Sequence, residues 1–449
     1  MAKLHTISTA LFRLLTISHF PYEGVISCEV AHFATNNNNI LAVISFDYTD
    51  KDFNIILMGR DRQRRYRSFQ VFCSFSTIED AIKKTKDEVA KIPDTQDEFY
   101  QGDEKRCFDV YRVVKNAKAL HPFFSSLNMP QHSPAKEVVR EIAYVFKDKD
   151  GNFIEQFQTA GFNARLFELY IFAYLHESQF IIDEKSSYPD FVFAKGKINF
   201  ALECTTVNPG KNDITSIPDD PEILKKLVAT YFPVKFGSSL FTKLNHRYKP
   251  DKKRYWELPQ VNGKPLIFAI EDFHLNGSMC CSHPGLERYL YGYDYEIAYG
   301  KNGNLRPKPQ KIDSFIWKTK RLEESFFDLA DAENISAVLF TNSATISKFN
   351  RMGKIAGFGD ANIRLIREGA RYDHDPNATM PIPFMFEINE NTKESWGEGL
   401  VMYHNPRAKI AINRNDFPDI AHMFLDENNL LRSFMPKFHP FTSTTHAIA

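Results

Sequence analysis

The sequence lacks the short motifs that mark several common enzyme classes. Its 449 residues contain no GxxxxGK[ST] phosphate-binding loop, no HExxH zinc helix and no GxSxG nucleophile turn. P-loop ATPase, zinc-peptidase and serine-hydrolase activities therefore have no support in the sequence. No internal repeat is visible either.

Cysteines are few and form no metal-binding or redox pattern. The chain has six of them, at Cys28, Cys73, Cys107, Cys204, Cys280 and Cys281. None belongs to a CxxC pair or to a spacing typical of zinc ligands, and the adjacent pair is not expected to form a disulfide. This usage favours a reducing, cytoplasmic location.

A net charge and a long hydrophobic segment are also missing. Lysine plus arginine and aspartate plus glutamate number 56 each, so any nucleic-acid surface has to be a local basic patch. The apolar stretch Ala10–Ser18 contains Arg13 and is too short to cross a bilayer. It also lacks the small-residue cleavage pattern of a signal peptide. We therefore expect neither a membrane segment nor a secretion signal.

The chain does contain enough apolar material for two or three folded domains. Hydrophobic residues make up 43% of it and 40 residues are phenylalanine, which argues against disorder. The expected divisions are an N-terminal α+β domain at 1–114, a linker at 115–132, a core at 133–345 with an insertion at 274–310, and a C-terminal extension at 346–449. Elements expected along the chain include strands at Ile40–Phe46, Phe53–Met58 and Ser68–Phe75 and a helix over Asp313–Ala332.

Two carboxylates lie on adjacent strand-like runs, Ser187–Lys195 and Ile198–Val207, which a tight turn at Gly196 joins. Side chains alternate between the two faces of a strand, so this hairpin would bring Asp190 near Glu203 on a common face. Paired carboxylates suit a hard cation such as Mg²⁺, which prefers oxygen ligands and keeps several waters. The pattern is typical of metal-assisted phosphodiester hydrolysis.

A long helix is expected just before this hairpin, over Ala164–Ser178. Its apolar residues cover most of the circumference, which predicts that the helix is largely buried. Glu168 is the only carboxylate inside the apolar stretch, and a buried ionised group needs a partner or a metal. We therefore expect Glu168 to face the same site.

The order of expected elements is a glutamate-bearing helix, a strand, the aspartate strand, the glutamate strand, a helix and a strand. With the Pro189-Asp190 and Glu203-Cys204-Thr205 segments, this order resembles the PD-(D/E)xK nuclease superfamily over Gly161–Phe273, about a quarter of the chain. The resemblance implies an α/β fold with a restriction-endonuclease-like αβββαβ core. It also implies cleavage of nucleic acid that depends on Mg²⁺ (or Mn²⁺), in restriction, repair or anti-phage defence.

When the family's residue roles are transferred to the matching positions, the resemblance implies that Asp190 and Glu203 are metal ligands. It implies that Glu168 is the helix carboxylate that binds a metal or orients a water. The family's motif lysine is replaced here by Thr205, whose hydroxyl can orient a water but carries no positive charge. Some members of the superfamily place this lysine on the following helix.

Two lysines on the helix after the hairpin are candidates for the displaced family lysine. We expect Lys243 to stabilise the charge on the reacting phosphate, with Lys235 as the second choice. If neither lysine reaches the site, the enzyme would be weak or inactive.

Five arginines lie between two strand runs and would sit at a hairpin tip: Arg60, Arg62, Arg64, Arg65 and Arg67. An arginine guanidinium can donate two hydrogen bonds to phosphate oxygens, so this hairpin would bind a nucleic-acid backbone. The alternative is a solvated charge run that protects a sheet edge.

A second basic segment follows the expected site helix and mixes cations with aromatic residues. Its cations are Arg247, Lys249, Lys252, Lys253 and Arg254. They would neutralise phosphates, while Tyr248, Tyr255 or Trp256 would stack on an exposed base. The alternative is a solvated helix end whose aromatic residues pack inward.

The sequence therefore favours a cytoplasmic metal-dependent endonuclease acting on DNA, with RNA as a possible substrate. The N-terminal domain would recognise the substrate, bind a partner protein or form a homo-oligomer. The rival hypothesis is a non-catalytic nucleic-acid-binding or assembly protein that has kept an inactivated nuclease scaffold. Thr205 in place of the motif lysine supports the rival.

Overall fold

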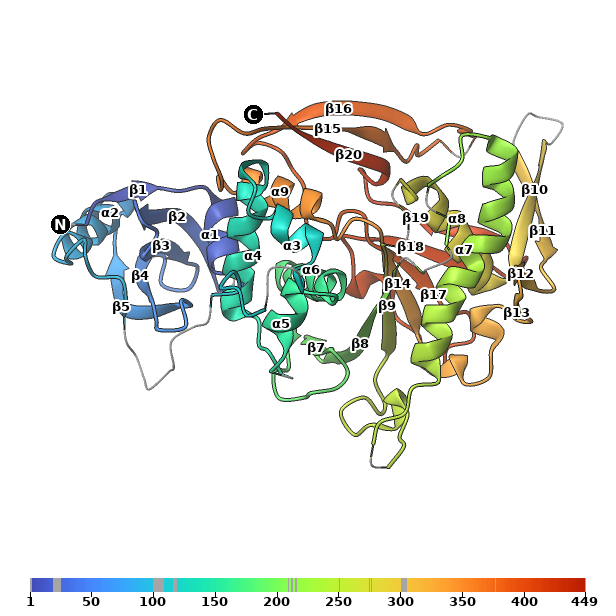
Figure 1. The fold of residues 1–449 in the computed structure, drawn as a ribbon. Coiled ribbons are helices and arrows are strands. Elements are labelled where there is room, and N and C mark those ends of the chain that lie inside the picture. The colour runs from blue at the N-terminus through green and yellow to red at the C-terminus, as the bar shows by residue number, and fades with distance from the viewer. Residues whose placement is uncertain are drawn as a thin grey trace. The chain divides into compact units, whose positions relative to one another are not determined.

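The computed structural model describes residues 2–18, 26–99, 109–115, 119–149, 151–208, 210, 213–214, 216–249, 251–273, 275, 277–299, 305–375 and 377–448. The mixed α/β class is confirmed (Figure 1). In the part of the chain described, no helix is long and apolar enough to cross a membrane.

The chain forms two compact units, each assembled from separate segments. The first comprises Met1–Gln158, Phe349–Ile363 and Ile388–Lys393, and the second comprises Thr159–Lys348, Arg364–Glu387 and Glu394–Ala449. The first unit therefore extends past residue 114 and takes in the segment expected as a linker. The segment expected as one C-terminal extension is divided between the two units.

The first unit contains an antiparallel sheet in the order β1-β2-β3-β4-β5. Its strands are β1 (Leu4–Thr6), β2 (Ser27–Thr35), β3 (Ile40–Asp47), β4 (Phe53–Arg60) and β5 (Tyr66–Phe75). Helix α2 (Ile78–Val89) begins after Thr77, whose side chain accepts a hydrogen bond from Asp80 N, and it packs on the sheet. The unit's remaining helices are α1 (Thr9–Leu15), α3 (Pro122–Ser126), α4 (Ser133–Val145), α5 (Phe153–Gln158) and most of α9 (Ile346–Ile355).

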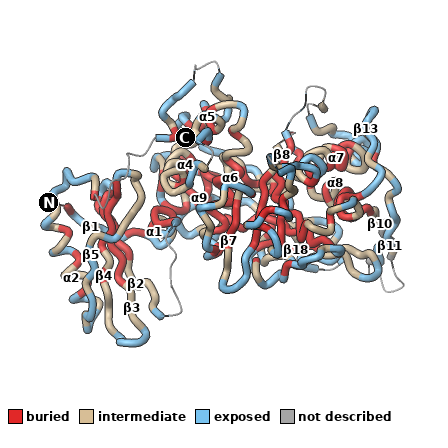
Figure 2. Tube along the Cα trace, turned by 90° about the horizontal axis from the view of Figure 1, so that it is seen from below, coloured by how far each residue is buried: buried red, intermediate tan, exposed pale blue. Residues whose placement is uncertain are grey.

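The second unit is built on an eight-stranded mixed sheet in the order β19-β18-β17-β14-β9-β8-β7-β6. Its strands are β6 (Ile181–Ile182), β7 (Phe191–Lys195), β8 (Ile198–Val207), β9 (Leu266–Asp272), β14 (Ala337–Thr341), β17 (Val401–His404), β18 (Ala421–Leu425) and β19 (Leu431–Phe434). The central strands β8, β9 and β14 run parallel. Strands β9 and β14 are buried along their whole length and β8 is buried through its middle (Figure 2), as expected for parallel strands covered on both faces.

Helices cover both faces of this sheet. Helix α6 (Phe162–Glu177) lies against one face, and α7 (Pro221–Leu244) and α8 (Met279–Tyr291) pack on the other (Figure 1). Helix α7 starts at Pro221, and Asp220 caps it by accepting hydrogen bonds from two backbone amides of the first turn. The order α6-β6-β7-β8-α7-β9 matches the expected order of elements.

The segment after β9 differs from the sequence expectation. Residues 274–310, expected as an irregular insertion, include helix α8 and a hairpin of β10 (Tyr293–Tyr299) and β11 (Leu305–Lys311). The helix expected over Asp313–Ala332 is wrong. This stretch contains β12 (Phe315–Trp317), β13 (Lys320–Leu322) and the 3₁₀ turn Phe326–Asp328. Its aromatic residues pack against α7 and α8 individually instead of forming one helical face.

A three-stranded sheet and a buried ionic network complete the second unit. The sheet is formed by β16 (Ile382–Ile388), β15 (Arg364–Arg371) and β20 (Pro440–Ile448).

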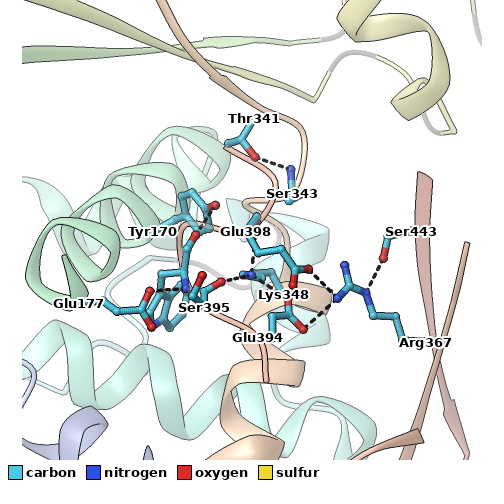
Figure 3. Close-up of polar contacts among 11 residues, drawn as sticks. Tyr170, Glu177, Thr341, Ser343, Lys348, Arg367, Glu394, Ser395, Glu398 and Ser443 are labelled. Carbon is cyan, nitrogen blue, oxygen red and sulfur yellow. Dashed lines mark hydrogen bonds and ion pairs between the residues drawn. The ribbon is translucent and has the colours of Figure 1, made fainter. Parts of the chain in front are cut away.

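The ionic network joins buried side chains of opposite charge. Lys348 Nζ lies 2.7 Å from Glu394 Oε1, and Arg367 Nη1 lies 2.7 Å from Glu398 Oε1 (Figure 3). Glu177 of α6 accepts a hydrogen bond from the backbone amide of Trp396. The network therefore fixes residues 394–398 beside α6.

Replacing Lys348 with Met is expected to lower the free energy of unfolding by about 3–5 kcal/mol. The side chains of Lys348 and Glu394 are both fully buried, so the substitution removes one of the two cations that neutralise this carboxylate and leaves Arg367 Nη1, 3.3 Å away, as the other. It also removes the donor to the Ser395 carbonyl. The matched control is Arg364→Met, which breaks the exposed pair with Glu387 and should change stability only slightly. Urea unfolding of both variants measures the difference, and equal small effects would contradict this account.

Candidate active site

Asp190 and Glu203 meet where strands β7 and β8 begin to pair. Phe191 lies opposite Leu202 in the antiparallel register, which sets the residue before β7 beside Glu203. The amide of Asp190 donates to Glu203 Oε2 at 3.3 Å, and the amide of Cys204 donates to Asp190 Oδ2 at 2.7 Å. The two carboxylates are therefore adjacent and held by backbone contacts.

Lys243 reaches this pair from helix α7. Its Nζ lies 2.5 Å from Glu203 Oε1, and the two side chains are 27% and 8% exposed. Lys235, two turns earlier on the same helix, instead contacts Asp213 Oδ2 at 2.5 Å. Of the two lysines proposed from the sequence, Lys243 is therefore the one that contacts the carboxylates.

Tyr255 is a further contact of Glu203. It lies in a 3₁₀ turn (Tyr255–Glu257), is 1% exposed, and donates from Oη to Glu203 Oε1 at 2.8 Å. The expectation that Tyr255 stacks on a base is therefore wrong, because its ring is buried and its hydroxyl orients a carboxylate. The sequence pattern did not separate this inward-facing tyrosine from its exposed basic neighbours.

Glu168 lies on α6 and is buried, as expected. Its direct partner is Arg165, whose Nη1 lies 2.7 Å from Glu168 Oε2. Burial raises the pKa of Glu168; the Arg165 charge opposes this rise and the Glu203 charge adds to it. Sequence reasoning missed Arg165, although its spacing of three residues on a helix is the signal for such a pair.

The electrostatics of the site are dominated by an excess of carboxylates. Burial raises the pKa of Asp190 well above its usual range, and the charges of Glu203 and Glu168 raise it further. Burial alone would lower the pKa of Lys243, but the attraction of Glu203 and Asp190 outweighs it, so the net shift is upward. Lys243 therefore stays protonated, and the site favours an additional cation.

The donor chemistry fits a divalent ion held by two carboxylates. Mg²⁺ commonly binds proteins through one or two carboxylates and retains several waters. Asp190 and Glu203 would supply those two ligands. Over the described residues no group of three or more His, Cys, Asp and Glu side chains forms a metal cluster. Glu168 as a third ligand stays a prediction.

Thr205 follows Glu203 on β8 and shares its face of the strand, because side chains two residues apart point the same way. It pairs in register with Ile270 and is partly buried. Its proposed part in orienting a water stays a prediction.

The basic segment after α7 is only partly neutralised. Arg254 Nη1 lies 2.9 Å from Asp331, and Lys253 Nζ lies 3.8 Å from Asp251. Trp256, a second proposed stacking residue, instead has the Arg254 guanidinium 5.3 Å from its ring centroid. The cations that remain exposed and make no ion pair among the described residues are Arg247, Lys249 and Lys252.

The arginine hairpin of the first unit is largely paired with acids. Arg65 Nη2 lies 2.8 Å from Asp61 and Arg67 Nη1 lies 3.9 Å from it, while Arg62 Nε lies 3.8 Å from Glu98. Arg64 donates to Asn39 Oδ1 and to a backbone carbonyl. These pairs weaken the positive field that the sequence suggests.

Arg60 is buried, so its expected place among the phosphate-binding arginines of the hairpin is wrong. It is 4% exposed, its Nη2 lies 2.8 Å from Glu141, and its guanidinium packs 4.2 Å from the Tyr66 ring centroid. Its charge is therefore neutralised by Glu141 inside the first unit, and a phosphate backbone could not reach its guanidinium.

No family model, curated protein or solved structure matches this chain.

Proposed function

We propose that the chain is a metal-dependent nuclease that hydrolyses phosphodiester bonds of DNA. The observation that supports this most is the convergence of Asp190, Glu203 and Lys243 from three different elements. Two carboxylates and a protonated lysine at one point combine cation binding with stabilisation of developing negative charge. A cytoplasmic role in restriction or anti-phage defence is the biological context that we propose.

In this proposal, Asp190 and Glu203 hold Mg²⁺ or Mn²⁺. The bound ion supplies charge stabilisation at the phosphate and activates water. The Tyr255 hydroxyl keeps Glu203 in a single orientation. Lys243 has three N–H donors, so one can hold Glu203 while another donates to a phosphate oxygen of the substrate.

Glu168 has a separate role in the proposed reaction. Burial raises the pKa of Glu168, which makes its carboxylate a stronger proton acceptor from water than an exposed glutamate. Arg165 fixes its carboxylate and limits the rise in pKa. Glu168 would therefore position or deprotonate the attacking water.

The substrate class is proposed from the exposed cations after α7. Arg247, Lys249 and Lys252 belong to the loop that also carries Tyr248, and the Tyr248 ring packs on Tyr255 beside the carboxylates. A basic loop at the rim of an acidic site attracts a polyanion and guides its phosphates toward the metal ligands. Nucleic acid is the phosphodiester that meets this description.

A non-catalytic scaffold is the second candidate function. Two of the site's carboxylates are already neutralised by cationic side chains, which favours this candidate: Lys243 pairs with Glu203, and Arg165 pairs with Glu168. Thr205 at the family's lysine position supports it as well. Such a protein would bind nucleic acid without cutting it.

Cleavage assays with the Glu203→Gln variant distinguish these two candidates. Purified protein is incubated with plasmid, single-stranded DNA and RNA in Mg²⁺, in Mn²⁺ and in EDTA. We expect the wild type to cut DNA only with the metal and Glu203→Gln to be inactive, because an amide is a weak ligand for a hard cation. Binding of nucleic acid unaffected by EDTA, with no cleavage of any substrate, would support the scaffold instead.

A further inference from the structure

A row of aromatic rings leads from the protein surface to the carboxylate site. The ring centroids of Tyr188 and Tyr248 lie 4.5 Å apart, and those of Tyr248 and Tyr255 lie 5.2 Å apart. The last ring reaches Glu203 through its hydroxyl. Burial increases along the row, since Tyr188 is 48% exposed and Tyr255 is 1% exposed.

Tyr188 is held in place although its ring is exposed. It comes two residues before Asp190, and its carbonyl accepts a hydrogen bond of 2.6 Å from Gln260 Nε2. The Tyr248 backbone is fixed as well, by a β-bridge to Lys253. Tyr188 therefore presents an exposed ring at the rim of the site, and the partly buried Tyr248 packs behind it, between Tyr188, His246 and Tyr255.

Unpaired cations flank these rings. Arg247 and Lys249 are the chain neighbours of Tyr248, and Lys252 directly precedes Lys253, the bridge partner of Tyr248. All three are exposed, and over the described residues none of them makes an ion pair. Aromatic rings beside free cations are the combination by which proteins bind single strands, with bases on the rings and phosphates on the cations.

We propose that the exposed ring of Tyr188, supported from behind by Tyr248, stacks on an unpaired base next to the phosphate that is cut, so that the substrate is single-stranded or locally unpaired nucleic acid. This inference rests on the proposed nuclease function. A base inside a duplex has both faces covered by its neighbours, so it can stack on a protein ring only after it leaves the helix. Tyr188 therefore selects for strand separation at the site.

Binding without catalysis tests this inference. Fluorescence anisotropy in EDTA compares a labelled single-stranded DNA with the same strand in a duplex. We expect the wild type to prefer the single strand, Tyr188→Ala to bind it about tenfold more weakly, and Tyr188→Phe to bind normally, because the ring is kept. The control is Phe434→Ala, which removes an exposed ring on β19 at the other edge of the same sheet.

The outcomes separate this inference from the proposed hydrolysis. Equal affinity for single strand and duplex, or no effect of Tyr188→Ala, would overturn the stacking surface even if the enzyme cuts DNA. Binding of the single strand that depends on Tyr188, in a protein that cuts nothing, would support the stacking surface and contradict the hydrolysis. Failure of the wild type to bind any nucleic acid would overturn the inference as well.

Discussion

The Asp190→Asn variant is expected to lose metal-dependent cleavage by about a thousandfold, because a catalytic metal contributes several kcal/mol. The same variant is expected to have a free energy of unfolding about 1 kcal/mol higher than that of the wild type, so it should unfold at a higher urea concentration. Burial and the charges of Glu203 and Glu168 make the ionised Asp190 unfavourable in the folded protein. An amide removes this repulsion and can still accept the hydrogen bond from the Cys204 amide.

The pH dependence of this stabilisation has a definite sign. Since the pKa of Asp190 is raised on folding, the folded protein binds a proton that the unfolded chain releases. The wild type therefore loses stability as the pH rises above the ordinary aspartate pKa of about 4. The stabilisation by Asp190→Asn should be largest at neutral and alkaline pH and should shrink on acidification. Urea unfolding at several pH values measures it, and a destabilised variant at pH 8 would contradict the account.

The Lys243→Met variant is expected to lower the cleavage rate by about 10²–10³-fold, the usual effect of removing one donor to a reacting oxyanion. In contrast to Asp190→Asn, it should also destabilise the fold. The substitution leaves Glu203 next to Asp190 without its counter-charge. Because about a quarter of the lysine side chain is exposed, we expect a loss of about 2 kcal/mol, less than for a fully buried pair.

The matched control for this variant is Lys235→Met. It removes a lysine from the same helix that pairs with Asp213 instead of the site. Its cleavage rate should remain that of the wild type. The double variant Lys243→Met with Glu203→Gln should recover the lost stability without recovering activity. Equal rate losses for Lys235→Met and Lys243→Met would show that Lys243 has no special role.

Much of the site's framework could be predicted because it depends on local sequence. The turn at Gly196 and the alternation of side chains in a strand are enough to bring Asp190 beside Glu203. Apolar residues lie around most of the circumference of α6, which likewise indicates that Glu168 is buried. Both inferences involve segments that are close in the chain and patterns of fixed period.

Contacts between distant segments could not be predicted in the same way. The choice of Lys243 over Lys235 depends on how α7 packs on the sheet, which no pattern within the helix encodes. The inward orientation of Tyr255 depends on a carboxylate 52 residues earlier in the chain. Arg60 looked like part of a surface charge run because its partner, Glu141, lies 81 residues away.

The most direct test of the proposed site is the single-turnover cleavage rate of an end-labelled single-stranded DNA as a function of Mg²⁺ concentration. The wild type and Lys235→Met should show the same saturating increase, and Asp190→Asn should stay about a thousandfold slower at every concentration. Cleavage by Asp190→Asn at the wild-type rate would contradict the account. So would a folded wild type that binds the DNA but leaves it intact at every Mg²⁺ concentration.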